Sequence, residues 1–164
     1  LYDLKDFSPL AVDWQADYAP EQAELQLVID DGFETGDFSG ASWSLSGHKD
    51  WVVSSDNIYK GSYSGKSGDI SDNQQSSLSI QVDLDSDAML SFHYRVSTEQ
   101  NYDYLRFYVD SSLEGSFSGD EPWMLYKISI PPGNHTLKWT YDKDSSVSSY
   151  DDCVWIDNIL LTEK

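Results

Sequence analysis

Apolar and polar side chains alternate with a period of two along most of this chain, and this alternation limits its possible folds more than any other feature. In residues 77–84, Leu78, Ile80, Val82 and Leu84 alternate with serine, glutamine and aspartate, as in a strand with one buried face. Comparable runs recur between clusters of Ser, Gly, Asn and Asp, which favour turns. About nine such runs predict an all-β fold, an antiparallel two-sheet β-sandwich. The expected strands are residues 24–29, 43–45, 51–53, 77–84, 89–96, 104–110, 123–130, 135–141 and 153–162.

The first 24 residues follow a different pattern. They are rich in Asp and Glu, contain Pro9 and Pro20, and show no sustained alternation. We interpret residues 1–24 as an N-terminal linker or arm, with a short helix over residues 20–27 as the alternative. A chain of 164 residues is the size of one domain, so residues 25–164 are expected to form a single β-sandwich module.

The charge of the chain excludes several classes of partner. There are 29 Asp and Glu residues against 10 Lys and Arg, a net charge of −19. Such a chain is expected to bind no nucleic acid, because nonspecific binding needs a basic surface, and to avoid anionic lipid. Its apolar runs are too short to span a bilayer, which predicts no membrane insertion. The chain does not open on a signal-peptide pattern, so we expect either an intracellular protein or a mature piece of a longer one.

Residues that commonly carry out catalysis are sparse. The three histidines, His48, His93 and His135, and the single cysteine, Cys153, are well separated in the sequence. Nothing resembles a nucleophile positioned next to a base, so the chain is predicted not to be an enzyme. Cys153 alternates with Trp155 and is expected to be a small buried residue.

Basic side chains occupy several strand positions that alternation assigns to the outside of the sandwich. Two interpretations stay open: a solvated face of mixed charge, or a ligand-binding face on which Tyr108 stacks against a sugar ring. The second requires that the strands concerned are neighbours in one sheet; otherwise the loop aromatics Trp51 and Trp123 are the alternative. The candidate ligand-binding residues are His93, Arg95, Arg106, Tyr108, Lys127 and Lys138.

One acidic segment near the C-terminus begins like a calcium-binding loop. Asp142, Asp144 and Ser146 have the spacing of the first three EF-hand ligands, but Val147 and Cys153 stand where that loop needs Gly and Glu. The segment is therefore not an EF-hand. It is either a simple acidic turn or a contributor to an irregular calcium site.

Four short motifs, taken in order, resemble a known group of proteins. They are Phe33-Glu34, Trp43 followed by Gly47, Gly61-Ser62-Tyr63-Ser64 and Asp157-Asn158-Ile159. Together they resemble the calcium-containing jelly-roll superfamily, which includes many carbohydrate-binding modules of secreted bacterial proteins and, more remotely, MAM adhesion domains. The resemblance implies jelly-roll topology and a non-catalytic binding or adhesion unit, and it names no particular ligand.

The same resemblance implies a structural metal site. The positions that match the family's ligands are Glu34 and Asp157, completed by backbone carbonyls near Lys60 and with Asp56 as a further carboxylate. The implied cofactor is Ca²⁺, which takes six to eight oxygen ligands. The alternative is that Glu34 and Asp157 only cap loops or pair with lysines.

These observations predict a carbohydrate-binding module that recognises polysaccharide, an anionic one if the basic positions form a single patch. The alternative is an adhesion or protein-interaction domain. In either case we expect the chain to be covalently linked to a catalytic or surface domain in a larger protein, secreted or at the cell surface.

Overall fold

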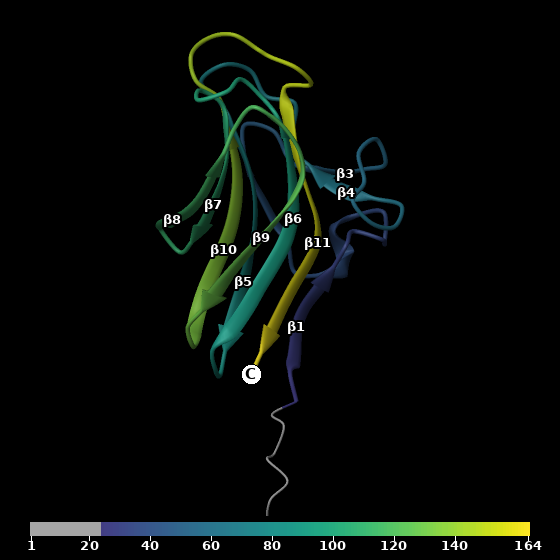
Figure 1. Ribbon diagram of the computed structural model, residues 1–164, viewed down its shortest axis with the longest axis vertical. Coiled ribbons are helices and arrows are strands. Elements are labelled where there is room, and N and C mark those ends of the chain that lie inside the picture. Colours follow the sequence, from purple (N-terminus) through teal and green to yellow (C-terminus); the bar gives the residue numbers. More distant parts are fainter. Residues whose placement is uncertain (1–23) are drawn as a thin grey trace, which may run out of the picture.

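Two antiparallel β-sheets face each other across one core in the computed structural model, which describes residues 24–164 (Figure 1). Sheet A contains β1 (Gln26–Asp31), β3 (Val52–Ser54), β4 (Ser64–Lys66), β6 (Ala88–Ser97), β9 (Asp120–Ile130) and β11 (Cys153–Glu163). Sheet B contains β2 (Ser44–Gly47), β5 (Gln75–Leu84), β7 (Tyr104–Val109), β8 (Ser112–Phe117) and β10 (Gly133–Asp142). The predicted all-β sandwich of jelly-roll type is confirmed. The predicted arm lies, except for Glu24, outside the described residues.

The order of strands explains how the chain closes the sandwich. Sheet A runs β3-β4-β11-β6-β9, and sheet B runs β2-β5-β10-β7-β8. β4 and β1 pair with successive parts of β11, at Trp155–Ile156 and at Ile159–Glu163. From β5 onward most connections cross from one sheet to the other. Connections β6–β7 and β10–β11 lie together at the end of the sandwich opposite the C-terminus (Figure 1).

Large aromatic side chains fill the space between the sheets. Phe92 of β6, Phe107 of β7 and Trp139 of β10 are fully buried, with ring centroids 5.0–5.3 Å apart. Loss of one such ring typically costs about 3–5 kcal/mol. The alternation along these three strands therefore assigned the inward side chains correctly. Alternation along residues 123–130 assigns Met124 to the inward side with Tyr126, Ile128 and Ile130. Met124 is nevertheless 45% exposed, because β9 is an edge strand and a register shift against β6 lies beside it.

Two local expectations were wrong. Residues 47–50, between the predicted strands 43–45 and 51–53, have the composition of a turn, which favours pairing of the two strands. Strands β2 and β3 instead belong to different sheets, so this stretch crosses the sandwich. Strand β8 was missed, because Gly115 interrupts its alternation and a short turn at Asp110, with φ of 56°, joins it to β7. Within residues 24–164, no helix is long and apolar enough to cross a membrane.

Candidate functional site

The six predicted ligand-binding residues do not form one patch. Arg106 and Tyr108 lie on β7 and Lys138 on β10, all on the outer face of sheet B. The other three, His93, Arg95 and Lys127, lie on β6 and β9 of sheet A. The outer faces of the two sheets point in opposite directions. Side chains that point outward from sheet A therefore lie on the opposite side of the sandwich from those that point outward from sheet B. The prediction of a single basic face is corrected to two separate groups of three.

The group on sheet B is held together by the pairing of β7 with β10. Lys138 is the direct partner of Tyr108, and its Nζ lies 4.8 Å from the centroid of the tyrosine ring. Arg106 lies 4.8 Å from the ring of Tyr104 and forms an ion pair with Asp142. Each cation thus lies over an aromatic ring, where the ring's quadrupole attracts it. Tyr104 was not among the ligand-binding residues predicted from the sequence, although its side chain points to the same side of β7 as that of Arg106.

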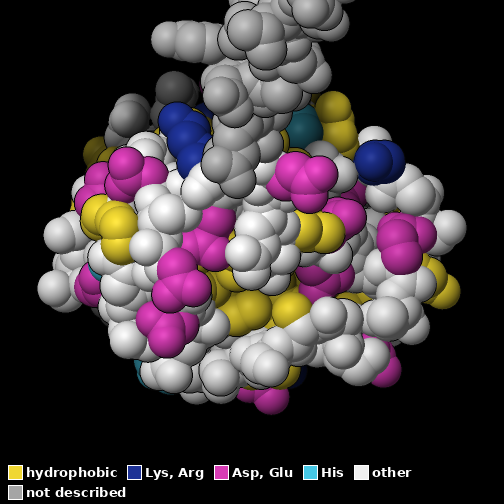
Figure 2. Space-filling view, turned by 90° about the horizontal axis from the view of Figure 1, so that it is seen from below, with side chains coloured by type: hydrophobic (Ala, Val, Ile, Leu, Met, Phe, Trp, Pro, Cys, Tyr) yellow, Lys and Arg dark blue, Asp and Glu magenta, His cyan; other side chains and the backbone are white. Residues whose placement is uncertain are grey.

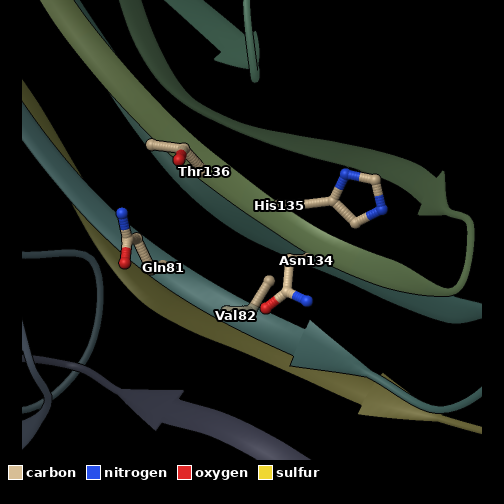
Figure 3. Close-up of a pocket in the computed structure, with 5 residues that line it drawn as sticks. All are labelled: Gln81, Val82, Asn134, His135 and Thr136. Carbon is tan, nitrogen blue, oxygen red and sulfur yellow. The ribbon is translucent and has the colours of Figure 1, made fainter.

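Hydroxyl and amide groups extend this outer face across β5. Ser77 and Thr140 share a hydrogen bond of 2.9 Å between their hydroxyl oxygens, and Gln81 is the register partner of Thr136. A hollow of about 130 Å³ lies at this end of the face, between the two neighbouring strands (Figure 3). Its lining residues are Gln81, Val82, Asn134, His135 and Thr136. Ser77 and Thr140 are buried, so the face combines tyrosine rings and cations with the neutral hydrogen-bonding groups that line the hollow.

One end of the hollow is fixed by a hydrogen-bonded histidine. The Nδ1 of His135 lies 2.9 Å from a carboxylate oxygen of Asp110, and its Nε2 lies 3.0 Å from the carbonyl oxygen of Pro131. The hydrogen bond with Asp110 raises the pKa of His135. The backbone N–H of Thr136 also donates to Asp110 and is the main cause of that carboxyl's lowered pKa. The β7–β8 turn is thereby fastened to β10.

The outer face of sheet A carries an aromatic cluster that the sequence did not reveal. Tyr59, from the connection between β3 and β4, stacks on His93 with ring centroids 3.6 Å apart, and Trp123 lies 6.0 Å away. Burial lowers the pKa of His93, and the charge of Lys127 adds to the effect. Arg95 lies over the ring of Trp155. The loop alternative is corrected in part: Trp51 is a core residue, only 2% exposed, whereas Trp123 is partly exposed.

The motif Phe33-Glu34 divides its two side chains between the core and a pocket. Phe33 is fully buried with φ of 60°, and its backbone N–H donates to Asp31 at 2.7 Å. Glu34 is exposed and lines a pocket of about 150 Å³ together with Asp157. The remaining lining residues are Asp30, Gly32, Lys60, Gly61 and Asn158. The structure thus brings together three of the four predicted metal-site residues, Glu34, Lys60 and Asp157.

Backbone amides of one loop hold both carboxylates of this pocket. Asp157 is fully buried and accepts hydrogen bonds from the N–H groups of Tyr59 and Lys60 at 2.9 and 3.0 Å. Glu34 accepts from Ser62 and Tyr63 at 2.9–3.1 Å. Burial raises the pKa of Asp157 against the opposing effect of these bonds, and the charge of Glu34 adds to the rise.

Asp56 lies outside this pocket, and its predicted role as a metal ligand is corrected. It pairs with Lys66 at 2.7 Å and accepts a hydrogen bond from the indole N–H of Trp155. Burial works to raise the pKa of Asp56, but hydrogen bonds from Lys66, Ser54 and Trp155 outweigh it and hold the value at about 2. Its two oxygens therefore serve an ion pair and an indole.

The donor set of the pocket fits a hard cation. Its anionic groups are carboxylates, whose oxygens suit calcium better than they suit nitrogen- or sulfur-preferring metals. Gly61 leaves space for the carboxylate of Glu34, because a Cβ at residue 61 would lie 2.3 Å from Oε1 of Glu34. Glu34 and Asp157 are the residues that would hold the ion.

Charge outside these sites is mostly negative. Figure 2 shows separate acidic side chains across the end of the molecule seen from below, with few lysines or arginines among them.

Cys153 is 5% exposed, as predicted, and burial raises the pKa of its thiol to about 12. The thiolate needed for nucleophilic chemistry is therefore disfavoured.

Comparison with known proteins identifies the fold. No protein-family model matches the sequence, and no curated protein does either. TmCBM61, solved in complex with β-1,4-galactotriose, is similar in structure, with a TM-score of 0.61, 20% identity, and 81% of this chain and 94% of that chain covered. The CBM22-1 xylan-binding domain of Paenibacillus barcinonensis Xyn10C gives a TM-score of 0.61, with 13% identity and coverage of 85% and 95%.

An adhesin domain is equally similar. The K3 cleaved adhesin domain of Lys-gingipain from Porphyromonas gingivalis gives a TM-score of 0.62, with 11% identity and coverage of 85% and 99%. The chain therefore has the β-sandwich fold found in carbohydrate-binding modules and in gingipain adhesin domains. This finding confirms the β-sandwich fold that the resemblance of the four sequence motifs implied.

Proposed function

We propose that this chain is a non-catalytic polysaccharide-binding module, stabilised by structural Ca²⁺, within a larger secreted or cell-surface protein. The observation that carries the proposal is the outer face of sheet B, where Arg106, Tyr108 and Lys138 lie on paired strands beside a polar hollow. Support also comes from the similar structures, since two of the three are carbohydrate-binding domains.

The chemistry of this face suits a sugar chain. A pyranose ring has an apolar face that packs on an aromatic side chain, and hydroxyl groups at its edge that need hydrogen-bond partners. Tyr104 and Tyr108 lie four residues apart on β7, roughly 13 Å at the usual rise of a strand. Beside them lie Thr136 and Gln81, which can donate and accept, whereas Thr140 is buried and bonded to Ser77. The face therefore offers stacking and hydrogen bonding along a line longer than one sugar ring.

The cations on this face favour an anionic polymer, such as one with uronic-acid or sulfated residues. A carboxylate or sulfate forms strong charge-assisted hydrogen bonds with guanidinium and ammonium groups. Lys138 contributes its charge at the centre of the face, next to Tyr108. Since the chain carries a net charge of −19, an anionic ligand is repelled elsewhere and is attracted mainly where such cations gather.

A bound Ca²⁺ at Glu34 and Asp157 would fasten the chain's first strand region to its last. An ion that binds only the folded state stabilises it by RT ln(1 + [L]/Kd), about 2.7 kcal/mol at a hundredfold excess over Kd. The two carboxylates line the same pocket, so the ion would also offset their mutual repulsion.

A second candidate function is adhesion to a protein partner through sheet A. Tyr59 and Leu125 are 46% and 49% exposed, and Leu125 is the register partner of His93, on which Tyr59 stacks. Exposed aromatic side chains are typical of protein interfaces. The similarity to a gingipain adhesin domain supports this alternative.

The two faces can be separated with matched tyrosine variants. We expect Tyr108→Ala to weaken retention in affinity gels that contain acidic polysaccharides by about tenfold, roughly 1.4 kcal/mol, with a melting temperature near that of the wild type. Tyr59→Ala, the control on the opposite face, should leave retention unchanged. Added salt should weaken binding of an acidic polymer, whereas binding of a neutral one should respond little.

If Tyr59→Ala weakened retention and Tyr108→Ala did not, the polysaccharide site would lie on sheet A instead. Retention of no polysaccharide by the wild type would contradict the proposed function and favour the adhesion alternative.

A further inference from the structure

A second group of carboxylates lies at the end of the sandwich opposite the C-terminus, away from the pocket of Glu34 and Asp157. Glu99 and Asp103 belong to the β6–β7 connection, and Asp144 belongs to the β10–β11 connection. One oxygen from each residue lies within 4.8 Å of the other two. Among residues 24–164 this is the only group of three potential metal-ligating side chains that lie so close together.

Two oxygens of this group are buried without hydrogen-bond partners. Asp103 is fully buried; its Oδ1 accepts from the backbone N–H of Asp144 at 2.9 Å, but its Oδ2 has no partner among the described residues. The Oε2 of Glu99 is in the same situation. A buried carboxylate oxygen without a partner is strongly unfavourable. The arrangement therefore leaves two oxygens prepared for a ligand that supplies positive charge.

Hydrogen bonds that involve no ligand hold the three residues in place. The carbonyl oxygen of Glu99 accepts from the backbone N–H of Asp103 at 3.1 Å. The hydroxyl of Thr98 donates to the carbonyl oxygen of Asp103 at 3.0 Å. The backbone N–H of Asn73 donates to the carbonyl oxygen of Asp144 at 2.6 Å. These bonds fix the backbone that carries the three side chains, and the N–H groups of Asp144 and Ser146 hold one carboxylate oxygen of Asp103 and of Asp144 respectively.

The nearest cation is already engaged by other acids. Lys143 is buried and forms ion pairs with Asp152 and, at 3.9 Å, with Asp72, and it donates a hydrogen bond to Ser148. Burial raises the pKa of Asp103, and the lowering effect of Lys143 does not offset it. One lysine shared with two other carboxylates cannot neutralise three more.

We propose that Glu99, Asp103 and Asp144 bind a calcium ion, separate from the ion proposed at Glu34 and Asp157. All three ligands are oxygens of carboxylates, the donors that Ca²⁺ prefers. Two oxygens on opposite sides of one Ca²⁺ are about 4.6–5.2 Å apart, since each lies 2.3–2.6 Å from the ion. Three oxygens that all lie within 4.8 Å of one another are close enough to share one such ion, which would join the β6–β7 and β10–β11 connections. It would also give a role to Asp144, whose segment fails as an EF-hand.

The experiment counts calcium ions and assigns each to its site. We would strip the full chain of metal with a chelator, remove the chelator, and titrate Ca²⁺ by calorimetry into the wild type, Glu34→Ala and Asp103→Asn. Asp103→Asn keeps the shape of the side chain and the acceptor for the N–H of Asp144, but removes the charge. The control is Asp72→Asn, which removes an acid beside Lys143 but outside the group of three.

We expect Asp103→Asn to bind one Ca²⁺ fewer than the wild type or to bind it at least tenfold more weakly. Asp72→Asn should match the wild type. Glu34→Ala should retain this calcium ion, so that failure of the first site and failure of this one give different results. Glu99→Gln provides a second test if Asp103→Asn folds poorly. Calcium stoichiometry and affinity unchanged in both variants would overturn the proposal, as would tighter binding of Mg²⁺ than of Ca²⁺.

Discussion

Replacing Gly61 with alanine should destabilise the fold considerably more than the same change at Gly36. Both glycines have positive φ, 84° and 79°, where a residue with a side chain loses roughly 1–2 kcal/mol. Their surroundings differ. A Cβ on Gly36 would make an ordinary contact of 3.7 Å with the ring of Tyr63, whereas a Cβ on Gly61 would lie 2.3 Å from Oε1 of Glu34.

The extra destabilisation at Gly61 comes from the hydrogen bonds that the carboxylate of Glu34 loses. Ordinary contact begins at 3.4 Å, so the carboxylate has to withdraw by 3.4 − 2.3 = 1.1 Å. It then loses hydrogen bonds from the N–H groups of Ser62 and Tyr63, each worth about 0.5–1.5 kcal/mol. Gly61→Ala should therefore cost about 1–3 kcal/mol more than Gly36→Ala. For a chain of this size, that difference lowers the melting temperature by a further 2–12 °C, approximately.

Thermal and urea unfolding of both variants, in chelator so that no metal contributes, measure this difference. A third comparison tests its cause: in a Glu34→Ala background the clashing carboxylate is gone, so Gly61→Ala should cost no more than Gly36→Ala. Equal destabilisation by the two glycine variants would refute the steric argument. So would an extra cost that persists without Glu34.

Two further predictions concern charge. Burial is the main cause of the raised pKa of Asp103. Its folded form therefore binds protons more tightly than its unfolded form, and this residue costs stability as the pH rises above its unfolded pKa of about 3.9. In chelator, melting curves should show the wild type losing stability relative to Asp103→Asn as the pH rises above about 4; a difference independent of pH would contradict this. The net charge of −19 predicts that stability rises between about 0.01 and 0.1 M NaCl, as the screening length falls from about 30 to 10 Å. Calcium is held saturating in this second series, and a flat or falling response would count against net repulsion.

Alternation predicted the fold well where both sheets cover a strand. Phe92, Phe107 and Trp139 all point inward as expected, because a one-residue shift would place each of them in water. The same rule was weakest at the edges. Met124 is the register partner of Tyr94 and so keeps its expected side, but it lies on edge strand β9, where the core no longer covers it. Strand β8 carries a glycine in place of one apolar side chain.

Sheet membership was the information that alternation could not supply. Parity places Arg95 and Arg106 on outer faces, but strands β6 and β7, although consecutive, belong to opposite sheets. Which strands become neighbours depends on how the connections cross the core, and those crossings leave no periodic signal. The Tyr59–His93 stack was missed for a similar reason, since a loop of irregular sequence brings the tyrosine to the face of β6.

The positions of the two proposed calcium sites and of the ligand face have a joint physical consequence. Each proposed calcium site includes a carboxylate from a connection between two strands. Glu34 lies in the β1–β2 connection and Asp103 in the β6–β7 connection. The ligand face instead consists of side chains within β7 and β10, held by continuous pairing from Leu137 to Asp142. Ladder hydrogen bonds and the buried aromatic core fix that pairing without an ion. Removal of calcium should therefore lower stability while leaving the geometry of the ligand face intact at temperatures where the chain stays folded. The proposed polysaccharide binding and the proposed calcium binding would then be separable, one set by strand register and the other by the connections.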